Sequence, residues 1–275
     1  MKAAVCFKII ADLNMPLDRD WNIVGQGLPD LSFVRQIFNC FDESSLEMGL
    51  KLQAQSKAAA EKIELTALTI DDQRADLFLK HLYALGYDHA VRIQPDDTMD
   101  LVFHPSWVSA VLSAYIADVG RQDLVILGMQ GGEGNNGETG YLVAERLGRP
   151  CIRNVMDIAL NGLEKQLTVT SMTDRGTMTQ TIDLPAVLIT GNSPCSPFLR
   201  VPTLKQKLKA STRQIKVLGQ KDPGLKDKGM IRKDKELTGL YRPESSRKIA
   251  FIEGQTAEDK ARTLYEQYLR DRLSQ

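Results

Sequence analysis

The residues of this sequence best suited to chemistry form a glycine- and amide-rich loop between an apolar run and a helical pattern. The apolar run covers residues 123–128, and the helical pattern opens near Thr139 with apolar side chains on one face. Glycines let backbone N–H groups approach a ligand closely, and a helix N-terminus carries partial positive charge. We therefore expect an anionic nucleotide to bind at Gly128, Gln130, Gly131, Gly132, Glu133, Gly134, Asn135, Asn136, Gly137, Glu138 and Thr139.

The segment from Gly132 to Gly137 also satisfies the GxGxxG pattern of dinucleotide-binding folds. Asp157 lies at the spacing expected for an acid that binds a ribose, so a stand-alone nicotinamide enzyme is one alternative. The classical fingerprint, however, follows the first strand of a sheet, whereas this loop follows the fourth predicted strand. That position argues against the nicotinamide enzyme, and the absence of GK[ST] after the loop excludes a P-loop.

Hydrolytic and metal chemistry find little support in the remaining residues. His81, His89 and His104 have neither HxxxH nor HExxH spacing, and no GxSxG marks a nucleophile elbow. We therefore expect no metal site and no catalytic residue. Cys6 is either a reactive thiol or, as we expect, a small side chain that packs near a nucleotide.

Composition indicates a cytoplasmic protein with a small-molecule or protein partner. The formal net charge is +0, so no global field favours nucleic acid or a membrane surface. No apolar run approaches the roughly 20 residues of a membrane span, and the N-terminal residues do not form a signal-peptide core. The four cysteines form no CxxC pair, which predicts buried, reduced thiols rather than disulfides or a zinc site: Cys6, Cys40, Cys151 and Cys195.

Alternating strand and helix patterns position the loop. Strands are predicted over residues 3–10, 63–70, 89–93, 123–128 and 151–155, and helices through 46–59, 73–85, 107–119 and 139–147. Such alternation is typical of right-handed βαβ units. We therefore predict an α/β fold with a doubly wound, mostly parallel sheet. It is Rossmann-like, of the adenine-nucleotide-binding type, and carries a C-terminal extended arm and helix.

Ligands of such sheets bind at the carboxyl ends of the strands, near the point where the strand order reverses. Cys6 lies near the C-terminal end of the first strand, Asn39 to Asp42 precede the first helix, and Ile70 closes the second strand. Either Asn39 or Asp42 can cap that helix. The topology brings these three groups and the glycine-rich loop to one crevice.

The second half of the chain has a different pattern. Residues 167–172 and 177–184 alternate as antiparallel strands, and residues 185–190 form a further apolar strand. We divide the chain into a nucleotide-binding core over residues 1–204, a basic flexible linker or arm over 205–248, and a C-terminal docking helix segment over 249–275. The linker is either solvated or wrapped over a partner subunit. Residues 249–252 are predicted as an edge strand, and Thr256 as the N-cap of an amphipathic helix.

Several short motifs, taken in order, resemble the beta subunit of electron transfer flavoproteins. The resemblance covers roughly residues 3–218, and the tail is similar to that of the longer bacterial members. The motifs are Val5-Cys-Phe-Lys8, Asn39-Cys-Phe-Asp-Glu43, Leu65-Thr-Ala-Leu-Thr69, Leu85-Gly-Tyr-Asp-His-Ala90, Leu127-Gly-Met-Gln130, Glu138-Thr-Gly140, Leu184-Pro-Ala-Val187 and Ile252-Glu-Gly254.

The resemblance implies a non-catalytic electron-carrier subunit that pairs with an electron transfer flavoprotein alpha subunit. The heterodimer would carry FAD between a flavin-dependent dehydrogenase, of the acyl-CoA type or similar, and a redox partner. The beta-subunit crevice would hold AMP, or a second FAD in an electron-bifurcating complex. Family binding positions fall on Cys6, on Asn39, Cys40, Phe41 and Asp42, on Ile70, and on the glycine-rich loop. Dehydrogenase docking falls on Val201 and Pro202.

Two departures from the family's pattern leave the identity of the nucleotide open. Cys40 stands where the family usually has a proline, and the loop is less acidic than usual. The choice between AMP and FAD, and whether electrons bifurcate, therefore remains undecided by the sequence. A nucleotide-binding regulatory module of the universal-stress-protein type is the alternative function, although its glycine motif places Tyr141 where that family has Ser or Thr.

Overall fold

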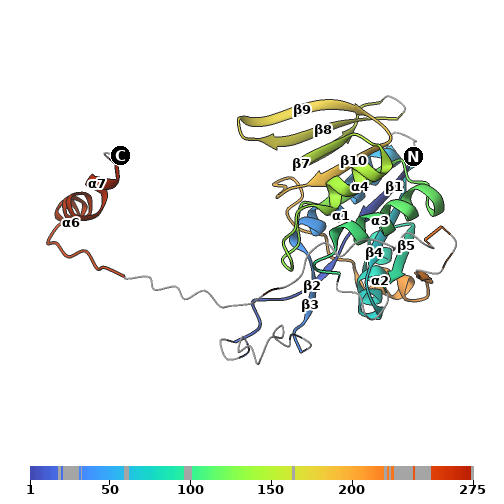
Figure 1. The fold of residues 1–275 in the computed structure, drawn as a ribbon, viewed down its shortest axis with the longest axis horizontal. Coiled ribbons are helices and arrows are strands. Elements are labelled where there is room, and N and C mark those ends of the chain that lie inside the picture. Colours follow the sequence, from blue (N-terminus) through green and yellow to red (C-terminus); the bar gives the residue numbers. More distant parts are fainter. Residues whose placement is uncertain are drawn as a thin grey trace. The chain divides into compact units, whose positions relative to one another are not determined.

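A computed structural model describes residues 1–17, 20, 31, 33–58, 62–95, 101–162, 165–219, 222, 224–225, 238 and 249–273 (Figure 1). The chain divides into two compact units, Met1–Thr238 and Gly239–Gln275. The first unit contains a nine-stranded sheet in the order β11-β5-β4-β1-β6-β10-β7-β8-β9 within the described residues. The strands β11 to β7 run parallel, and β7, β8 and β9 pair antiparallel at one edge. The predicted α/β fold with a doubly wound, mostly parallel sheet is confirmed.

The elements of the first unit follow the expected alternation. Its strands are β1 (Lys2–Cys6), β2 (Ile9–Ala11), β3 (Gln36–Phe38), β4 (Glu64–Ile70), β5 (His89–Gln94), β6 (Leu124–Gly128), β7 (Cys151–Leu160), β8 (Gln166–Thr173), β9 (Gly176–Asp183), β10 (Ala186–Thr190) and β11 (Lys216–Gly219), and its main helices are α1 (Cys40–Ala58), α2 (Asp76–Leu85), α3 (Pro105–Ala114), α4 (Thr139–Leu147) and α5 (Leu204–Ser211). Helices cover both faces of the parallel strands, which is why those strands read as continuous apolar runs.

Two hydrophobic clusters, one on each face of the sheet, form the core. Because successive side chains of a strand point to opposite faces, Leu124 and Ile126 of β6 join one cluster, whereas Val125 and Leu127 join the other. The first cluster contains Leu46, Leu50 and Leu52 of α1 and Leu79 and Leu82 of α2. The second contains Trp107, Val111 and Leu112 of α3 and Val143 and Ala144 of α4. Packing against the two faces of the sheet positions the helices whose N-termini border the site.

The first predicted strand, residues 3–10, is divided in two. β1 ends at Cys6, and Ile9–Ala11 instead pairs antiparallel with β3 in a separate two-stranded sheet. The break has a tertiary cause: the N–H of Lys8 donates to the Asp42 carboxylate at 3.0 Å rather than to a neighbouring strand. The sheet therefore opens at the end of β1.

The segment that the sequence pattern assigned to a linker begins with ordered structure. Residues 204–211 form α5, and β11 pairs with β5 at the sheet edge. Its basic residues bind the core, since Arg213 donates to the carbonyl of Tyr87 at 2.9 Å and stacks over Tyr83 at 3.9 Å. Tertiary contacts thus override a composition typical of solvated chain. Most of residues 220–248 lies outside the described residues.

The described residues of the second unit are helical at their end. Residues 257–273 run as α6 (Ala257–Leu264), a π-helical turn η4 (Tyr265–Leu269) and α7 (Arg270–Leu273). Thr256 caps α6 as predicted, since its side chain accepts from the N–H of Asp259. The predicted edge strand at 249–252 is wrong, because those residues take no regular structure. Among the described helices, none is long and apolar enough to cross a membrane.

Candidate functional site

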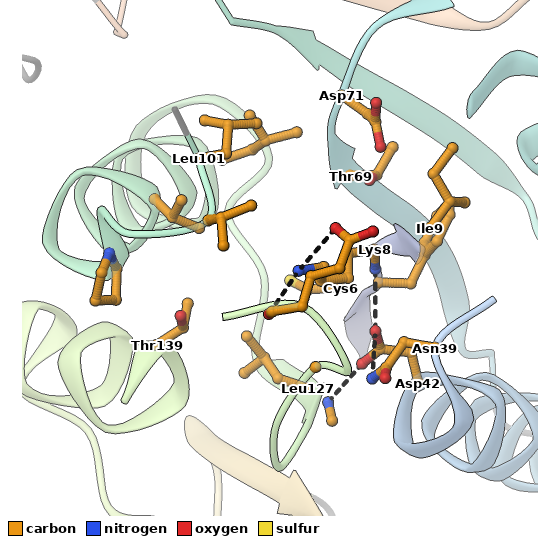
Figure 2. A pocket seen from close by; sticks show the side chains of 18 of the residues that line it. Cys6, Lys8, Ile9, Asn39, Asp42, Thr69, Asp71, Leu101, Leu127 and Thr139 are labelled. Atoms are coloured by element: carbon orange, nitrogen blue, oxygen red, sulfur yellow. Dashed lines mark hydrogen bonds and ion pairs between the residues drawn. The ribbon is translucent and has the colours of Figure 1, made fainter. Parts of the chain in front are cut away.

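A cavity of about 690 Å³ lies at the carboxyl ends of β1, β4, β5 and β6 (Figure 2). Strand order reverses here, because β4 and β5 extend to one side of β1 whereas β6 extends to the other. Such a switch point is where open α/β sheets bind ligands. The volume lies within the range of small-molecule pockets, about 300–1,000 Å³. The cavity is therefore the candidate binding site.

Asp42 joins the three segments that form the floor of this cavity. Its Oδ1 accepts from the N–H of Gly128 at 3.0 Å, and its Oδ2 accepts from the N–H of Lys8 at 3.0 Å. The side chain of Asn39 donates to Asp42 Oδ2 at 3.2 Å and to the carbonyl of Gln130 at 2.8 Å. Burial raises the pKa of Asp42 to about 6 against the opposing effect of these hydrogen bonds. Asp42 is thus a structural junction rather than a helix cap.

Lys8 and Glu133 attach the glycine-rich loop to β2. Lys8 Nζ lies 3.9 Å from Glu133 Oε2 and donates to the Glu133 carbonyl at 3.3 Å. Glu133 Oε1 also accepts from the N–H of Ala11 at 3.2 Å. Both side chains are about one-third exposed at the cavity, with fractions of 37% and 32%. The Lys8 ammonium group and the Glu133 carbonyl therefore meet where the loop crosses the end of β1.

The loop leaves hydrogen-bond donors free at the start of α4. Glu138 precedes α4 without a side-chain cap, and the N–H groups of Gly131, Gly137 and Thr139 have no acceptor among the described residues. Gly137 has φ +65°, a conformation that other residues rarely adopt, and it reverses the chain before the helix. Free N–H groups at a helix N-terminus form an anion site.

The cavity also has an apolar wall. It is formed by α3 and the residues before it, together with the ends of the central strands: Leu101, Val102, Pro105, Val108, Leu112, Leu68, Ile70 and Leu127. Asn136 connects the loop to this wall by donating to the carbonyl of Val102 at 2.7 Å. A ligand with an anionic end and a flat apolar end matches both sides.

Most of the predicted binding residues line the cavity. Those that do are Cys6, Asn39, Asp42, Ile70, Gly128, Gln130, Gly131, Glu133, Asn136, Gly137, Glu138 and Thr139. Five do not line it: Cys40, Phe41, Gly132, Gly134 and Asn135. The geometry of α1 explains the first two, because residues three apart share a helix face and Asn39 and Asp42 are the pair that faces inward. Whether each lining residue binds a cofactor stays a prediction.

The cysteines differ from the expectation of buried thiols. All four are free, but Cys40 and Cys195 are exposed, and Cys151 is half-buried. Cys6 is buried at the cavity floor, and burial raises the pKa of its thiol. Its burial in the second hydrophobic cluster favours the predicted packing role of Cys6 over a reactive thiolate. No group of three or more potential metal ligands occurs among the described residues.

A polar group after β4 was missed by sequence reasoning. Asp71, Asp72 and Arg74 line the cavity directly beyond Ile70. Burial raises the pKa of Asp71 to about 6. A signal was present, because Ile70 had been placed in the crevice and the next residues continue from the same strand end. Asp157, the acid of the GxGxxG alternative, lies on β7 and does not line the cavity.

The segment predicted to dock a dehydrogenase projects from a fixed base. Val201 is 80% exposed and Phe198 is 76% exposed, whereas Pro202 is buried. Arg200 fixes the base through paired hydrogen bonds from its Nε to both oxygens of Glu47, each 3.0 Å. The chain thus holds two apolar side chains in solvent beside an ion pair.

Known proteins with similar sequences share one family description. A family model described as the electron transfer flavoprotein domain matches residues 32–223. YgcR of Escherichia coli K12, provisionally named an electron transfer flavoprotein subunit, is 32% identical over 281 residues, which cover 99% of each chain. The electron transfer flavoprotein beta subunit of Methylophilus methylotrophus is 26% identical over 90% of this chain and 92% of its own. The mitochondrial beta subunit of Arabidopsis thaliana is 28% identical over 69% of this chain and 71% of its own. The chain therefore belongs to the electron transfer flavoprotein family, and to its beta subunits.

Proposed function

We propose that this chain is the beta subunit of a heterodimeric electron transfer flavoprotein. It pairs with an alpha subunit, and the heterodimer carries electrons between a flavin-dependent dehydrogenase and a redox partner. Family membership supports the electron-transport role, and the exposed Val201 segment supports a docking role. FAD supplies the redox chemistry when it is bound, while the protein contributes binding, orientation and electrostatics.

The single observation that carries the proposal is the cavity with a free α4 N-terminus at the switch point. Its residues fit an adenine nucleotide, either AMP or the adenosine end of a second FAD. The N–H groups of Gly131, Gly137 and Thr139 would hold the phosphate. The apolar wall from α3 would cover the base and exclude water from it.

The chain's own residues fix this geometry before a nucleotide arrives. Asp42 ties the start of the loop to α1, and Lys8 holds the middle of the loop near β2. A site whose donors are already positioned loses less ordering entropy on binding. The regulatory-module alternative has no comparable support, since the family model and the full-length relative both point to electron transfer flavoproteins.

Co-expression of this chain with its cognate alpha subunit tests the proposal. We expect the two chains to co-purify as a heterodimer with flavin absorption bands. Acid extraction followed by chromatography then identifies the nucleotide in the beta-subunit cavity as AMP or FAD. A colourless, stable monomer that ignores the alpha subunit would overturn the proposal.

A further inference from the structure

The end of β4 presents two polar side chains that the proposed function leaves without a role. Thr69 is 1% exposed, and its hydroxyl has no hydrogen-bond partner among the described residues. Asp71 follows two residues later, so the two side chains lie on the same side of the extended backbone. Both line the cavity, and Figure 2 shows them next to each other at its β4 side.

The Asp71 carboxylate retains free acceptor capacity. Its Oδ1 accepts from the N–H of Asp72 at 2.7 Å, and its Oδ2 accepts no hydrogen bond among the described residues. The nearby Arg74 is bound by Asp72, because its Nε lies 3.0 and 2.9 Å from the two Asp72 oxygens. An ionised carboxylate accepts hydrogen bonds only, so the free oxygen of Asp71 can accept from hydrogen-bond donors of a ligand.

The charges along the strand ends decide which ligand donors reach Asp71. From β4 through β1 to β6 the order is the Asp71 carboxylate, the Lys8–Glu133 ion pair and the free N–H groups of the glycine-rich loop. A phosphate is attracted to the free N–H groups and repelled by the Asp71 carboxylate, while Glu133 offsets the charge of Lys8. β4 and β6 lie two strand spacings apart, about 10 Å, which separates a phosphate from Asp71. The hydrogen-bond donors of the nucleotide that face Asp71 therefore belong to its uncharged part.

We infer that Asp71, with Thr69, binds the cis-diol of the nucleotide's ribose and makes the cavity selective for ribonucleotides with free 2′ and 3′ hydroxyls. The inference rests on the proposed nucleotide-binding function. Topology supports it, because Asp71 directly follows β4, the second strand of the βαβ unit β1-α1-β4, and dinucleotide folds place a ribose-binding acid after the corresponding strand. A carboxylate accepts from both hydroxyls of a diol but repels a 2′-phosphate.

Isothermal titration of the full-length chain, freed of bound nucleotide, tests the inference with AMP, 2′-deoxy-AMP and adenosine 2′,5′-bisphosphate. AMP should bind about tenfold more tightly than 2′-deoxy-AMP, which is the value of one charge-assisted hydrogen bond, and the bisphosphate should bind more weakly than AMP. Asp71→Asn should weaken AMP binding and bring the ratio of AMP to 2′-deoxy-AMP affinity close to one. Asp157→Asn, which removes a carboxylate on β7 that does not line the cavity, should keep the ratio, and circular dichroism checks that both variants fold.

The outcomes separate the inference from the function on which it rests. Equal affinities of the wild-type chain for AMP and 2′-deoxy-AMP overturn the inference while nucleotide binding stands. An unchanged ratio in a folded Asp71→Asn variant overturns the role of Asp71. Absence of any binding of AMP or FAD to the wild-type chain overturns the inference and the proposed nucleotide site together.

Discussion

Replacing Gly128 with Ala should strongly destabilise the chain, because β6 passes too close to α1 for a side chain. A Cβ at this position would overlap with Asp42 Oδ1 and would lie 3.0 Å from both Asp42 N and Phe41 Cβ. Two of these neighbours are fixed by the start of α1. The Asp42 carboxylate is the third, and it is buried and accepts hydrogen bonds from three N–H donors.

The expected magnitude follows from what must move. If the carboxylate moves away, the hydrogen bond from the N–H of Gly128 to a charged acceptor is lost, at about 1.5–3 kcal/mol. If it stays, overpacking costs about 1–3 kcal/mol. Because the close contacts with Asp42 N and Phe41 Cβ persist in either case, we expect the free energy of unfolding to fall by about 3 kcal/mol. That loss is large against a typical total of about 5–15 kcal/mol.

Urea unfolding of the wild-type and variant chains measures this loss. Gly132→Ala is the matched control in the same loop, since its Cβ would meet only the Ile10 side chain at 3.2 Å and should cost less than about 1 kcal/mol. In an Asp42→Ala background, Gly128→Ala should cost at least about 1 kcal/mol less, because the obstructing carboxylate is gone. Equal costs of Gly128→Ala in both backgrounds would refute the proposed clash.

The remaining predictions concern binding. Thr139→Ala should weaken retention of nucleotide about threefold to tenfold during gel filtration, because it removes a hydroxyl that lines the cavity beside the phosphate donors, while the backbone N–H remains. Unchanged occupancy contradicts a contact between this hydroxyl and the nucleotide. Val201→Asp should slow reduction of the heterodimer by its dehydrogenase but leave alpha-subunit affinity unchanged, since Val201 is 80% exposed; equal rates in stopped-flow absorbance contradict the docking role. Deleting residues 240–275 should weaken alpha-subunit binding without unfolding the core, because the described helices there bury no side chain. An unchanged affinity for the alpha subunit, measured by calorimetry, would contradict a docking role of this segment. Lowering the pH from about 7.5 to about 5 should reduce the preference for AMP over 2′-deoxy-AMP, because burial raises the pKa of Asp71 to about 6 and the carboxylate becomes protonated. The charged groups around Asp71 are Asp72, Arg74 and Glu133. A ratio of affinities that stays constant with pH contradicts the role of the carboxylate.

The sequence was sufficient to predict the sheet because its strands alternate with helices in the order that right-handed βαβ units require. An apolar run such as residues 123–128 is interpreted as a buried strand once helical patterns precede and follow it in the sequence. The crevice followed from the same rule, since Asn39, Ile70 and Gly128 mark three neighbouring element ends. Local periodicity and topology thus carry the fold and the outline of the site.

Long-range contacts account for what the sequence did not predict. No local pattern reveals that Lys8 turns its N–H to Asp42, which divides the first strand. Composition suggested a linker after residue 204, yet contacts with α2 and β5 order α5 and β11. Asp71 was missed although it directly follows Ile70, because its significance also depends on the charges across the cavity.

The most direct test of the central claim is the nucleotide content of the purified heterodimer, measured after acid release and expressed per beta chain. The cavity at the switch point predicts one adenine nucleotide per beta chain, either AMP or a second FAD, in addition to the FAD of the heterodimer. The Gly128→Ala heterodimer should retain less of it, because the floor of the cavity is displaced. A flavin-bearing heterodimer whose beta chain releases no adenine nucleotide would contradict the assignment of this cavity.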